Sequence, residues 1–209
     1  MSTKRVFLVG STGTVGSAVA TALAAWEHDV VVANFEADVA AGELRIDITD
    51  THSVAAAYSA VGAVDAVICT VGVVPLKPLA EWTKADVDEA VAGKLSSQID
   101  IVLQGLAYVR PGGSFTLVSG IMSRMPWKGG IGATIVDGGI DAFVLGAAAE
   151  LGQDRRINAI SPTILKESVD KIGKNLLPGN EPVPAAVVAC AFLRSVEGIE
   201  TGKVFVVGK

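Results

Sequence analysis

The residues whose types and spacing most clearly suggest chemistry form a glycine-rich turn near the N-terminus. Residues 6–9 are apolar and partly β-branched, which predicts a buried strand, and Gly10, Gly13 and Gly16 follow it. A helical pattern rich in Ala and Val runs from Ser17 to Trp26. Such a strand–turn–helix junction lets the backbone approach a pyrophosphate, and the unpaired N–H groups at the helix N-terminus favour its negative charge.

The spacing alone leaves two interpretations of this turn open. Glycines at a tight strand-to-helix turn can be purely structural, because they adopt backbone conformations that other residues avoid. Alternatively, the turn is a dinucleotide-binding loop. Its contacts with the dinucleotide would then come from the whole turn, which consists of Gly10, Ser11, Thr12, Gly13, Thr14, Val15 and Gly16.

The elements that position this turn alternate between buried strands and helices. Further strands are predicted at residues 30–34, 43–46, 65–71, 114–119, 157–160 and 204–207. Helices are predicted at residues 53–60, 132–151 and 185–195. Residues 81–110 are predicted to be helical for most of their length, with Pro111-Gly112-Gly113 ending the helix. This alternation predicts an α/β fold, with residues 1–209 forming a single-domain, Rossmann-like, doubly wound parallel sheet with helices on both faces. Ligands of such sheets bind at the carboxyl ends of the strands, where the glycine turn lies.

Composition narrows the classes of partner. Of the 209 residues, 50% are hydrophobic, which is enough for a full core. The net charge of −5, without a basic cluster, argues against nucleic acid. Apolar runs are short and broken by Gly, Asp and Pro, so we expect no membrane span, and residues 1–5 leave no room for a signal peptide.

The cysteines and histidines indicate the cellular compartment and the kinds of site to expect. Cys69 and Cys190 each lie in an apolar run and are expected to be small buried hydrophobic residues, which fits a reducing, cytoplasmic compartment. The two histidines, His28 and His52, fall near predicted element boundaries. We therefore expect neither a metal site nor a histidine-based catalytic triad.

Several segments, taken in order, resemble the short-chain dehydrogenase/reductase family over essentially the whole chain. The glycine turn has the GxxGxxG spacing of its atypical and extended members. The other matching segments are Asp47-Ile48-Thr49-Asp50 (family DVTD), Cys69-Thr70-Val71-Gly72 (NNAG), residues 78–86 (PL-E-T-ED), residues 156–162 (RVNAVSP) and residues 201–208 (TG…VDG). The resemblance implies a nicotinamide dinucleotide cofactor, NAD or NADP, bound by the glycine turn and by Asn34, Asp47, Ile48, Thr70, Val71, Gly72 and Pro162.

Two of these residues have open alternatives. The family's first aspartate in DVTD meets the adenine amino group, but the segment of Asp47 could also simply begin a helix, with Asp50 or Thr51 as its cap. Asn34, at the predicted end of the second strand, can hydrogen-bond either cofactor, and no arginine is adjacent. Glu36 would serve NAD only if the strand ended later, and family resemblance slightly favours NADP.

The catalytic segment departs from the family pattern. Family chemistry uses a tyrosine acid, a lysine four residues later and a serine on the fifth strand. Aligning the helix ending at residues 143–151 places Ala133 at the tyrosine position and Asp137 at the lysine position. The serine position falls on Gly120, one residue after Ser119, and Lys94 lies near the position of the family's helix asparagine.

The residues that could replace the missing groups are Ser119, Lys94 and Asp137. Lys94 could be a general acid or base near the site, or a solvated helix residue. Asp137 could pair with Lys94 or bind a ribose, or be a partly exposed helix carboxylate. Ser119 offers a hydroxyl to a substrate, or hydrogen-bonds at the end of its strand.

The segment between the fifth strand and the long helix suggests the substrate and the assembly. Met122, Met125 and Trp127 suit a small apolar carbonyl or alcohol substrate, or pack against the next helix or a partner subunit. The nearby glycines at positions 129, 130, 132, 138 and 139 are expected to allow close approach of another helix or of a ligand, and an interface between subunits is the preferred explanation. Because the family dimerises through its long helices, we expect a homodimer or homotetramer.

Two functional hypotheses follow. The first is an NAD(P)-binding oxidoreductase with an atypical catalytic centre. The second is a catalytically inactive Rossmann-fold protein that senses a dinucleotide or acts through its dimer surface. Both rest on a well-matched adenosine half of the site beside a changed catalytic segment.

Overall fold

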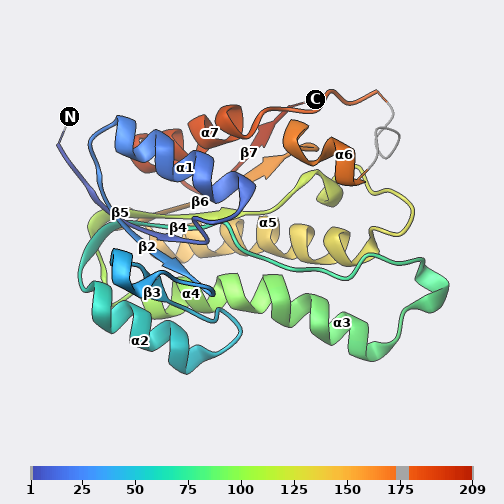
Figure 1. Ribbon diagram of the computed structural model, residues 1–209, viewed down its shortest axis with the longest axis horizontal. Helices are drawn as coiled ribbons and strands as arrows, with labels where there is room; N and C mark the ends of the chain where they lie inside the picture. The colour runs from blue at the N-terminus through green and yellow to red at the C-terminus, as the bar shows by residue number, and fades with distance from the viewer. Residues whose placement is uncertain (1, 173–178, 209) are drawn as a thin grey trace.

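A single parallel sheet forms the centre of the protein. The computed structural model describes residues 2–172 and 179–208, and in these the sheet has seven strands in the order β3-β2-β1-β4-β5-β6-β7 (Figure 1). The strands are β1 (Arg5–Val9), β2 (Asp29–Asn34), β3 (Leu44–Arg45), β4 (Val64–Cys69), β5 (Val109–Val118), β6 (Arg156–Pro162) and β7 (Lys203–Val207). All neighbouring pairs are parallel, which confirms the predicted fold class.

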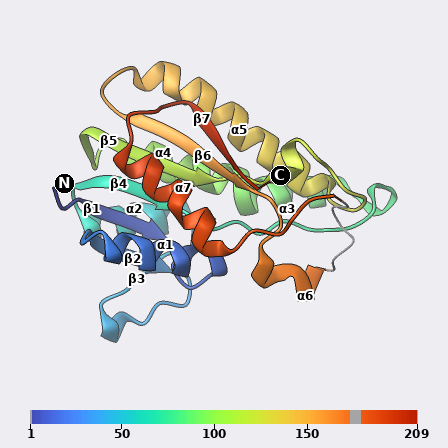
Figure 2. The ribbon, with the colours of Figure 1, turned by 90° about the horizontal axis from the view of Figure 1, so that it is seen from above.

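Helices connect the strands and cover both faces of the sheet. They are α1 (Thr14–Ala25), α2 (Thr51–Val61), α3 (Lys84–Ala90), the π-helical turn η3 (Val91–Ser96), α4 (Ser97–Gly105), α5 (Ile131–Leu151), α6 (Val169–Ile172) and α7 (Ala185–Glu197). Short 3₁₀ turns are η1 (Val39–Ala41), η2 (Leu79–Glu81), η4 (Ile121–Ser123) and η5 (Lys166–Ser168). In Figure 1, α1 and α7 lie above the sheet, and α2, α4 and α5 lie below it. Figure 2 shows α1 beside α7.

Alternating side chains of the strands feed two separate cores. In β1, Phe7 and Val9 point into the core shared with α2, α4 and α5, where Phe7 packs edge-to-face on Tyr58. Val6 and Leu8 point to the opposite face, into the core shared with α1 and α7. Because successive strand residues face opposite sides, burial of both faces requires the continuous apolar runs seen in the sequence.

The order of the strands places a ligand site at one edge of the sheet. The chain moves from β1 outward to β3 and then returns to add β4 beside β1, so the winding direction reverses between β1 and β4. The carboxyl ends of these two strands lead to Gly10 and Thr70. A reversal of this kind leaves a crevice at the carboxyl edge, which is the usual ligand position in such sheets.

Residues 81–110 are helical for most of their length, as predicted, but the predicted end of this helical segment is wrong. The structure has η2, α3, η3 and α4 there, and β5 already begins at Val109. Val109 is buried and pairs with Val64, and the strand register shifts between Val64 and Ala66. Pro111-Gly112-Gly113 therefore lies inside β5 rather than at a helix end, and Gly112 adopts a positive φ of 79°. A short apolar stretch next to a helix does not reveal by its pattern alone that it pairs with a distant strand.

Helix α5 is longer and more apolar than the short apolar runs expected from the sequence. It has 21 residues, and its most apolar window has a mean hydropathy of 1.5, so by length and composition it could cross a membrane. In this fold one face of α5 packs on β6, η4 and η3, and Val136, Ile140 and Val144 are fully buried. The helix therefore serves as a core helix whose other face remains uncovered in the single chain.

The remaining predicted elements are present with ends shifted by a few residues. Helix α1 begins at Thr14 rather than Ser17, because Gly13 already takes the N-cap position. The expected burial is right for Cys69, whereas Cys190 is exposed on α7, so that part of the prediction is wrong.

Candidate functional site

The three glycines of the N-terminal turn have different structural requirements. Gly10 has a φ of 92°, which strains any residue with a Cβ, and a Cβ there would lie 2.9 Å from the Thr70 hydroxyl. A Cβ on Gly16 would overlap the carbonyl oxygen of Gly10, so Gly16 lets α1 pack closely on the turn. Gly13 has neither requirement, because the nearest atom to its Cβ position is 3.9 Å away. Its open surface is what a pyrophosphate needs for close approach.

The N-terminus of α1 supplies donors for that approach. The N–H of Ser17 makes the first helical hydrogen bond, 2.9 Å from the carbonyl oxygen of Gly13, so the N–H groups just before it have no helical acceptor. Gly13 provides no side-chain cap, and the first turn of α1 contains no acidic residue. The turn therefore fits an anionic diphosphate in shape and in charge.

Side chains from the two neighbouring strands hold the turn. The Thr70 hydroxyl, just after β4, donates to the carbonyl oxygens of Gly10 at 2.9 Å and Val9 at 3.1 Å. On the other side, Asn34 Oδ1 accepts from the N–H of Thr12 at 3.3 Å. Asn34 Nδ2 donates to Ser11 Oγ at 2.9 Å and to Glu43 Oε2 at 3.0 Å. Thr70 and Asn34 therefore fix the conformation of the loop through hydrogen bonds within the protein.

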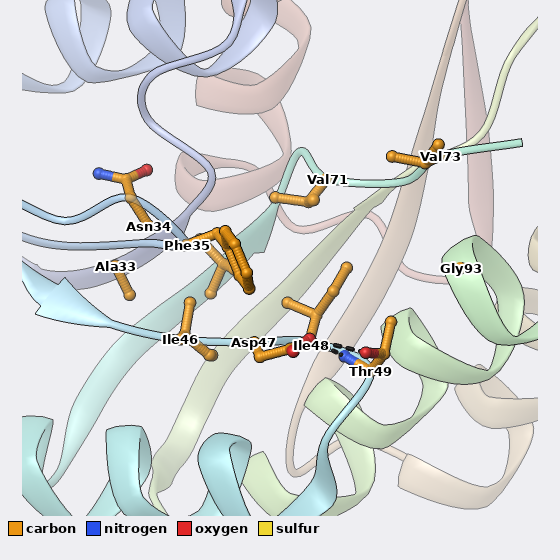
Figure 3. A pocket seen from close by; sticks show the side chains of 11 residues that line it. Ala33, Asn34, Phe35, Ile46, Asp47, Ile48, Thr49, Val71, Val73 and Gly93 are labelled. Carbon is orange, nitrogen blue, oxygen red and sulfur yellow. Dashed lines mark hydrogen bonds between the residues drawn. The ribbon is translucent and has the colours of Figure 1, made fainter.

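A cavity of about 330 Å³ opens beside the turn, between the ends of β2 and β4. Asn34, Asp47, Ile48 and Val71, all predicted cofactor residues, line it (Figure 3). The prediction missed the other lining residues, which are Val9, Ala33, Phe35, Ile46, Thr49, Val73 and Gly93. Most are apolar, as suits the flat face of a base. Among these residues, Phe35 could have been predicted, because it directly follows the end of β2.

Asp50, and not Asp47, caps the helix that follows this segment, while Asp47 lines the cavity. Asp47 Oδ1 accepts from the N–H of Thr49 at 2.9 Å and from its hydroxyl at 2.7 Å. The side-chain and backbone hydrogen bonds from Thr49 lower the pKa of Asp47, so this carboxylate at the cavity is ionised at neutral pH. Asp50 caps α2 by accepting from the N–H of His52 at 2.9 Å, as the alternative predicted.

The structure brings the three candidate catalytic residues together. Lys94 Nζ lies 2.6 Å from Asp137 Oδ1 and 3.3 Å from the carbonyl oxygen of Ser119. The side chains of Lys94 and Asp137 are only 12% and 3% exposed, so neither the solvated lysine nor the exposed carboxylate is found. Lys94 belongs to η3, and π-helical turns inside longer helices are frequent at functional sites.

Two glycines make room for this ion pair. A Cβ on Gly72 would lie 2.8 Å from Lys94 Cδ, and a Cβ on Gly120 would lie 2.6 Å from Asp137 Oδ2. Gly72 is therefore in contact with the lysine side chain, which links the ion pair to the segment after β4. Since Thr70 in the same segment holds the glycine turn, the ion pair and the turn share one edge of the sheet.

The electrostatics of this cluster are set mainly by burial. Desolvation raises the pKa of Asp137, while the charge and hydrogen bond of Lys94 act in the opposite direction. Asp141, one turn further along α5, also raises the pKa of Asp137, and Arg124 lowers it. The Ser119 hydroxyl is buried and has no hydrogen-bond partner among the described residues. A buried hydroxyl of this kind is available to a ligand.

Pro162 ends β6 beside Val207 of β7. The next residue, Thr163, is 4% exposed, and its hydroxyl has no partner within residues 2–172 and 179–208. Its backbone N–H donates to the carbonyl oxygen of Val207 at 2.9 Å. The segment that resembles the family's RVNAVSP strand thus presents a second spare hydroxyl, at a neighbouring strand end.

The segment before α5 divides into a buried and an exposed part. Met122 is buried, Met125 is 44% exposed, and Trp127 lines a mainly apolar cavity of about 530 Å³ together with Pro78 and Leu79. Such a cavity could hold the apolar part of a ligand.

Close packing inside the chain explains several glycines of this region. A Cβ would lie 2.9 Å from Trp127 at Gly130, 2.6 Å from Trp82 at Gly132 and 2.7 Å from Leu95 at Gly139. Contacts within the chain therefore account for these three glycines without the predicted subunit interface. Gly138, by contrast, has open space beside it.

A parallel sheet with a glycine turn at its reversal point defines a Rossmann-like fold. The family model described as enoyl-(acyl carrier protein) reductase matches residues 10–177. With this match over most of its length, the chain belongs to the short-chain dehydrogenase/reductase family of oxidoreductases.

Individual relatives agree with that assignment. The protein lin1944 from Listeria innocua is 37% identical, with a TM-score of 0.91 covering 97% of this chain and 98% of that one. A small-chain dehydrogenase solved in complex with NADPH is 25% identical, with a TM-score of 0.85 covering 99% of this chain and 97% of that one. The L-xylulose reductase of Mesocricetus auratus is 26% identical over 181 residues, which is 80% of this chain and 74% of that protein.

Proposed function

We propose that the protein is a nicotinamide-dinucleotide-dependent oxidoreductase that interconverts a small carbonyl compound and its alcohol, with Lys94 as the proton donor. The observation that carries the proposal is the buried pair of Lys94 and Asp137. Lys94 Nζ also donates to the backbone carbonyl oxygen of Ser119 at 3.3 Å, and the hydroxyl of Ser119 is buried without a partner among the described residues. This cluster lies at the same sheet edge as a glycine turn that fits a diphosphate. The neighbour bound to NADPH supports a dinucleotide at that turn.

Each residue of the cluster has a defined part in this chemistry. The bound dinucleotide would exchange a hydride with the carbonyl carbon. Lys94 Nζ, which donates to Asp137 Oδ1 at 2.6 Å, gives a proton to the carbonyl oxygen as that oxygen becomes an alcohol. Ser119 Oγ donates a hydrogen bond to the same oxygen. In the oxidation direction, Lys94 takes the proton back.

The alignment of α5 with the family supports a centre of this unusual kind. It places Ala133 at the tyrosine position and Asp137 at the lysine position. A cation is still available, but it comes from η3 rather than from α5. The positive charge of the family's lysine would thus be supplied by Lys94, and its buried partner on α5 would hold it in place.

We infer the substrate class from the cavity at the start of α5. Trp127, Pro78 and Leu79 line it with apolar surface, which favours a small apolar carbonyl or alcohol over a strongly polar one.

Binding and turnover measured separately test the proposal. Calorimetric titration with NADH and NADPH should give binding of at least one of them, and a panel of aldehydes and ketones should consume it. Lys94→Met should keep dinucleotide binding and lose turnover. The matched control, Lys84→Met, removes a lysine that is 81% exposed on α3 and should leave both unchanged. Binding without turnover over the whole panel would favour the sensor hypothesis instead.

We also propose that the chain assembles as a homodimer or homotetramer through the outer face of α4 and α5. Leu103 on α4 and Leu145 on α5 are 58% and 61% exposed, and Gly138 and Gly146 have open space beside them. Such a flat apolar face suits a second copy of the same face. Analytical ultracentrifugation of wild type and Leu145→Glu tests it, since the variant should shift towards monomer. A wild-type monomer at micromolar concentration would contradict the proposal.

A further inference from the structure

A small polar cavity lies between the start of α2 and the helical segment formed by η3 and α4. Helices α2 and α4 lie side by side below the sheet (Figure 1), and the cavity has a volume of about 220 Å³. Its lining residues are Ile48, Thr49, Thr51, Ala92, Ser96, Ser97 and Asp100. Ile48 and Thr49 also line the cavity beside the glycine turn, so the two cavities adjoin at this segment.

Ser97 brings to this cavity a buried hydroxyl that no protein group satisfies. The residue is 3% exposed, and its Oγ has no hydrogen-bond partner among the described residues. A serine inside a helix commonly donates to the carbonyl oxygen four residues earlier. For Ser97 this is the carbonyl oxygen of Gly93, which already accepts from the N–H of Val73 at 3.2 Å. Because a buried hydroxyl without a partner costs free energy, a ligand that bonds to Ser97 removes that cost.

Asp100 brings a negative charge to the same cavity. It follows Ser97 by three residues on α4, so the two side chains are neighbours on one face of the helix. The carboxylate of Asp100 forms no hydrogen bond or ion pair within residues 2–172 and 179–208. The lining residues from this part of the chain include no lysine, arginine or histidine. The cavity therefore holds one uncompensated negative charge.

The two threonines show which hydrogen bonds remain open. The Thr49 hydroxyl donates its hydrogen to Asp47 Oδ1 at 2.7 Å, so towards the cavity it can only accept. Thr51 Oγ1 accepts from Gln104 Nε2 at 2.9 Å. No lining side chain contributes an N–H group. A ligand that fits this surface must therefore bring positive charge and hydrogen-bond donors of its own.

We propose that this cavity binds a small organic ammonium ion, with the ammonium group at Asp100 and Ser97 and the alkyl part against Ile48 and Ala92. An ammonium group carries three donors and no acceptor, and its hydrogen bond to a carboxylate belongs to the strong, charge-assisted class. One carboxylate among neutral hydroxyls supplies too few charged ligands for Ca²⁺ or Mg²⁺. The bound ion would contact η3, the turn that carries Lys94, but its binding requires no dinucleotide.

NMR titration of the full chain with n-propylammonium chloride tests the inference. The amide signals of Ala92, Ser96 and Ser97 should shift and saturate, with half-saturation on the order of 1 mM for a ligand of this size. Tetramethylammonium carries the charge without donors, and 1-propanol has the shape without the charge. Each should bind at least about tenfold more weakly. Magnesium chloride should move these signals no more than sodium chloride at the same ionic strength.

Two variants test the two polar groups separately. Asp100→Asn keeps the size of the side chain and removes its charge, so the half-saturation concentration should rise at least about tenfold. Ser97→Ala should raise it about threefold or more, while thermal stability stays unchanged or increases because a buried hydroxyl without a partner is removed. The matched control, Glu89→Gln, removes the same charge from an exposed residue of α3 outside the cavity. Its half-saturation concentration should stay within about twofold of wild type.

Thermal unfolding of each variant checks that the fold is kept. The inference is overturned if n-propylammonium produces no saturable shift at this cavity up to about 50 mM. It is equally overturned if Asp100→Asn binds the ion as well as wild type does, or if magnesium gives the stronger saturable response. Because the titration contains no dinucleotide and no substrate, each of these results would leave the proposed function intact.

Discussion

Lys94 Nζ and Asp137 Oδ1 lie 2.6 Å apart although 43 residues separate them in the chain. The lysine comes from a π-helical turn and the aspartate from the core-facing side of α5, and both side chains are almost completely buried. A buried ion pair of this kind recovers its desolvation cost only while both partners are present, because a single remaining charge would be buried without compensation.

This relationship predicts a large loss of stability when the carboxylate alone is removed. Asp137→Asn leaves the Lys94 charge without its partner and should lower the free energy of unfolding by about 3–5 kcal/mol in urea denaturation. Adding Lys94→Met should recover part of that loss, because the double variant buries no charge. The control is Asp88→Asn in the exposed pair of Lys84 and Asp88 on α3, which should cost less than about 1 kcal/mol. Strictly additive effects of the two core substitutions would show that the pair is not coupled.

Substitutions in the glycine turn should separate binding from stability. Gly13→Asp places an acid at an N-cap where there is open space, so stability should be unchanged or slightly higher. The same carboxylate crowds and repels a diphosphate, and dinucleotide affinity should fall by more than about tenfold. Gly16→Ala should instead lower the free energy of unfolding by about 1–3 kcal/mol, because its Cβ would overlap the Gly10 carbonyl oxygen. Unchanged affinity in Gly13→Asp would contradict the assignment of the turn.

The sequence predicts the fold correctly where a short segment has a characteristic pattern of residues. The apolar runs of the strands predicted the sheet, and the glycine spacing predicted the turn and its place at the sheet edge. The residues that line the cavity beside the glycine turn were only partly predicted. Val73 and Gly93 reach this cavity from segments that carry no motif of their own.

Long-range relationships explain the remaining errors. The start of β5 at Val109 depends on its pairing with Val64, which is distant in sequence, so a helix looked equally suitable. The burial of Lys94 depends on Gly72 and on Asp137 of another helix, and lysine is usually solvated. The hydrogen bond from Asn34 to Glu43 joins the end of β2 to the segment before β3, and no local sequence pattern indicates it.

The two cysteines should differ sharply in reactivity. Burial raises the pKa of the Cys69 thiol to about 11, whereas Cys190 is exposed. Because the thiolate is the reactive form, a chromogenic disulfide reagent at neutral pH should modify one thiol in the native protein and both after unfolding. Cys190→Ser should abolish the native reaction. Rapid modification of Cys69 in that variant would contradict the buried position.

Asp86 should titrate well below an ordinary aspartate. Hydrogen bonds from Lys77 first, and then from Thr83, lower its pKa from 3.8 to about 2. Because the folded-state pKa is depressed, the stabilising contribution of Asp86 to the start of α3 is present above about pH 3.8 and is lost as the pH falls towards 2. Carboxyl carbon chemical shifts followed by NMR measure the midpoint directly. Lys77→Met should raise it, and a midpoint near 3.8 in wild type would contradict the contact.

Thr70 and Asn34 hold the glycine turn from opposite sides, through hydrogen bonds to Gly10, Ser11 and Thr12. The loop is therefore already ordered when the chain folds, so ligand binding there costs little additional conformational entropy. Such a preorganised loop should bind in a single kinetic phase, without a slow isomerisation after the encounter. Loosening either hydrogen-bonding side chain would then slow association as well as weaken the complex.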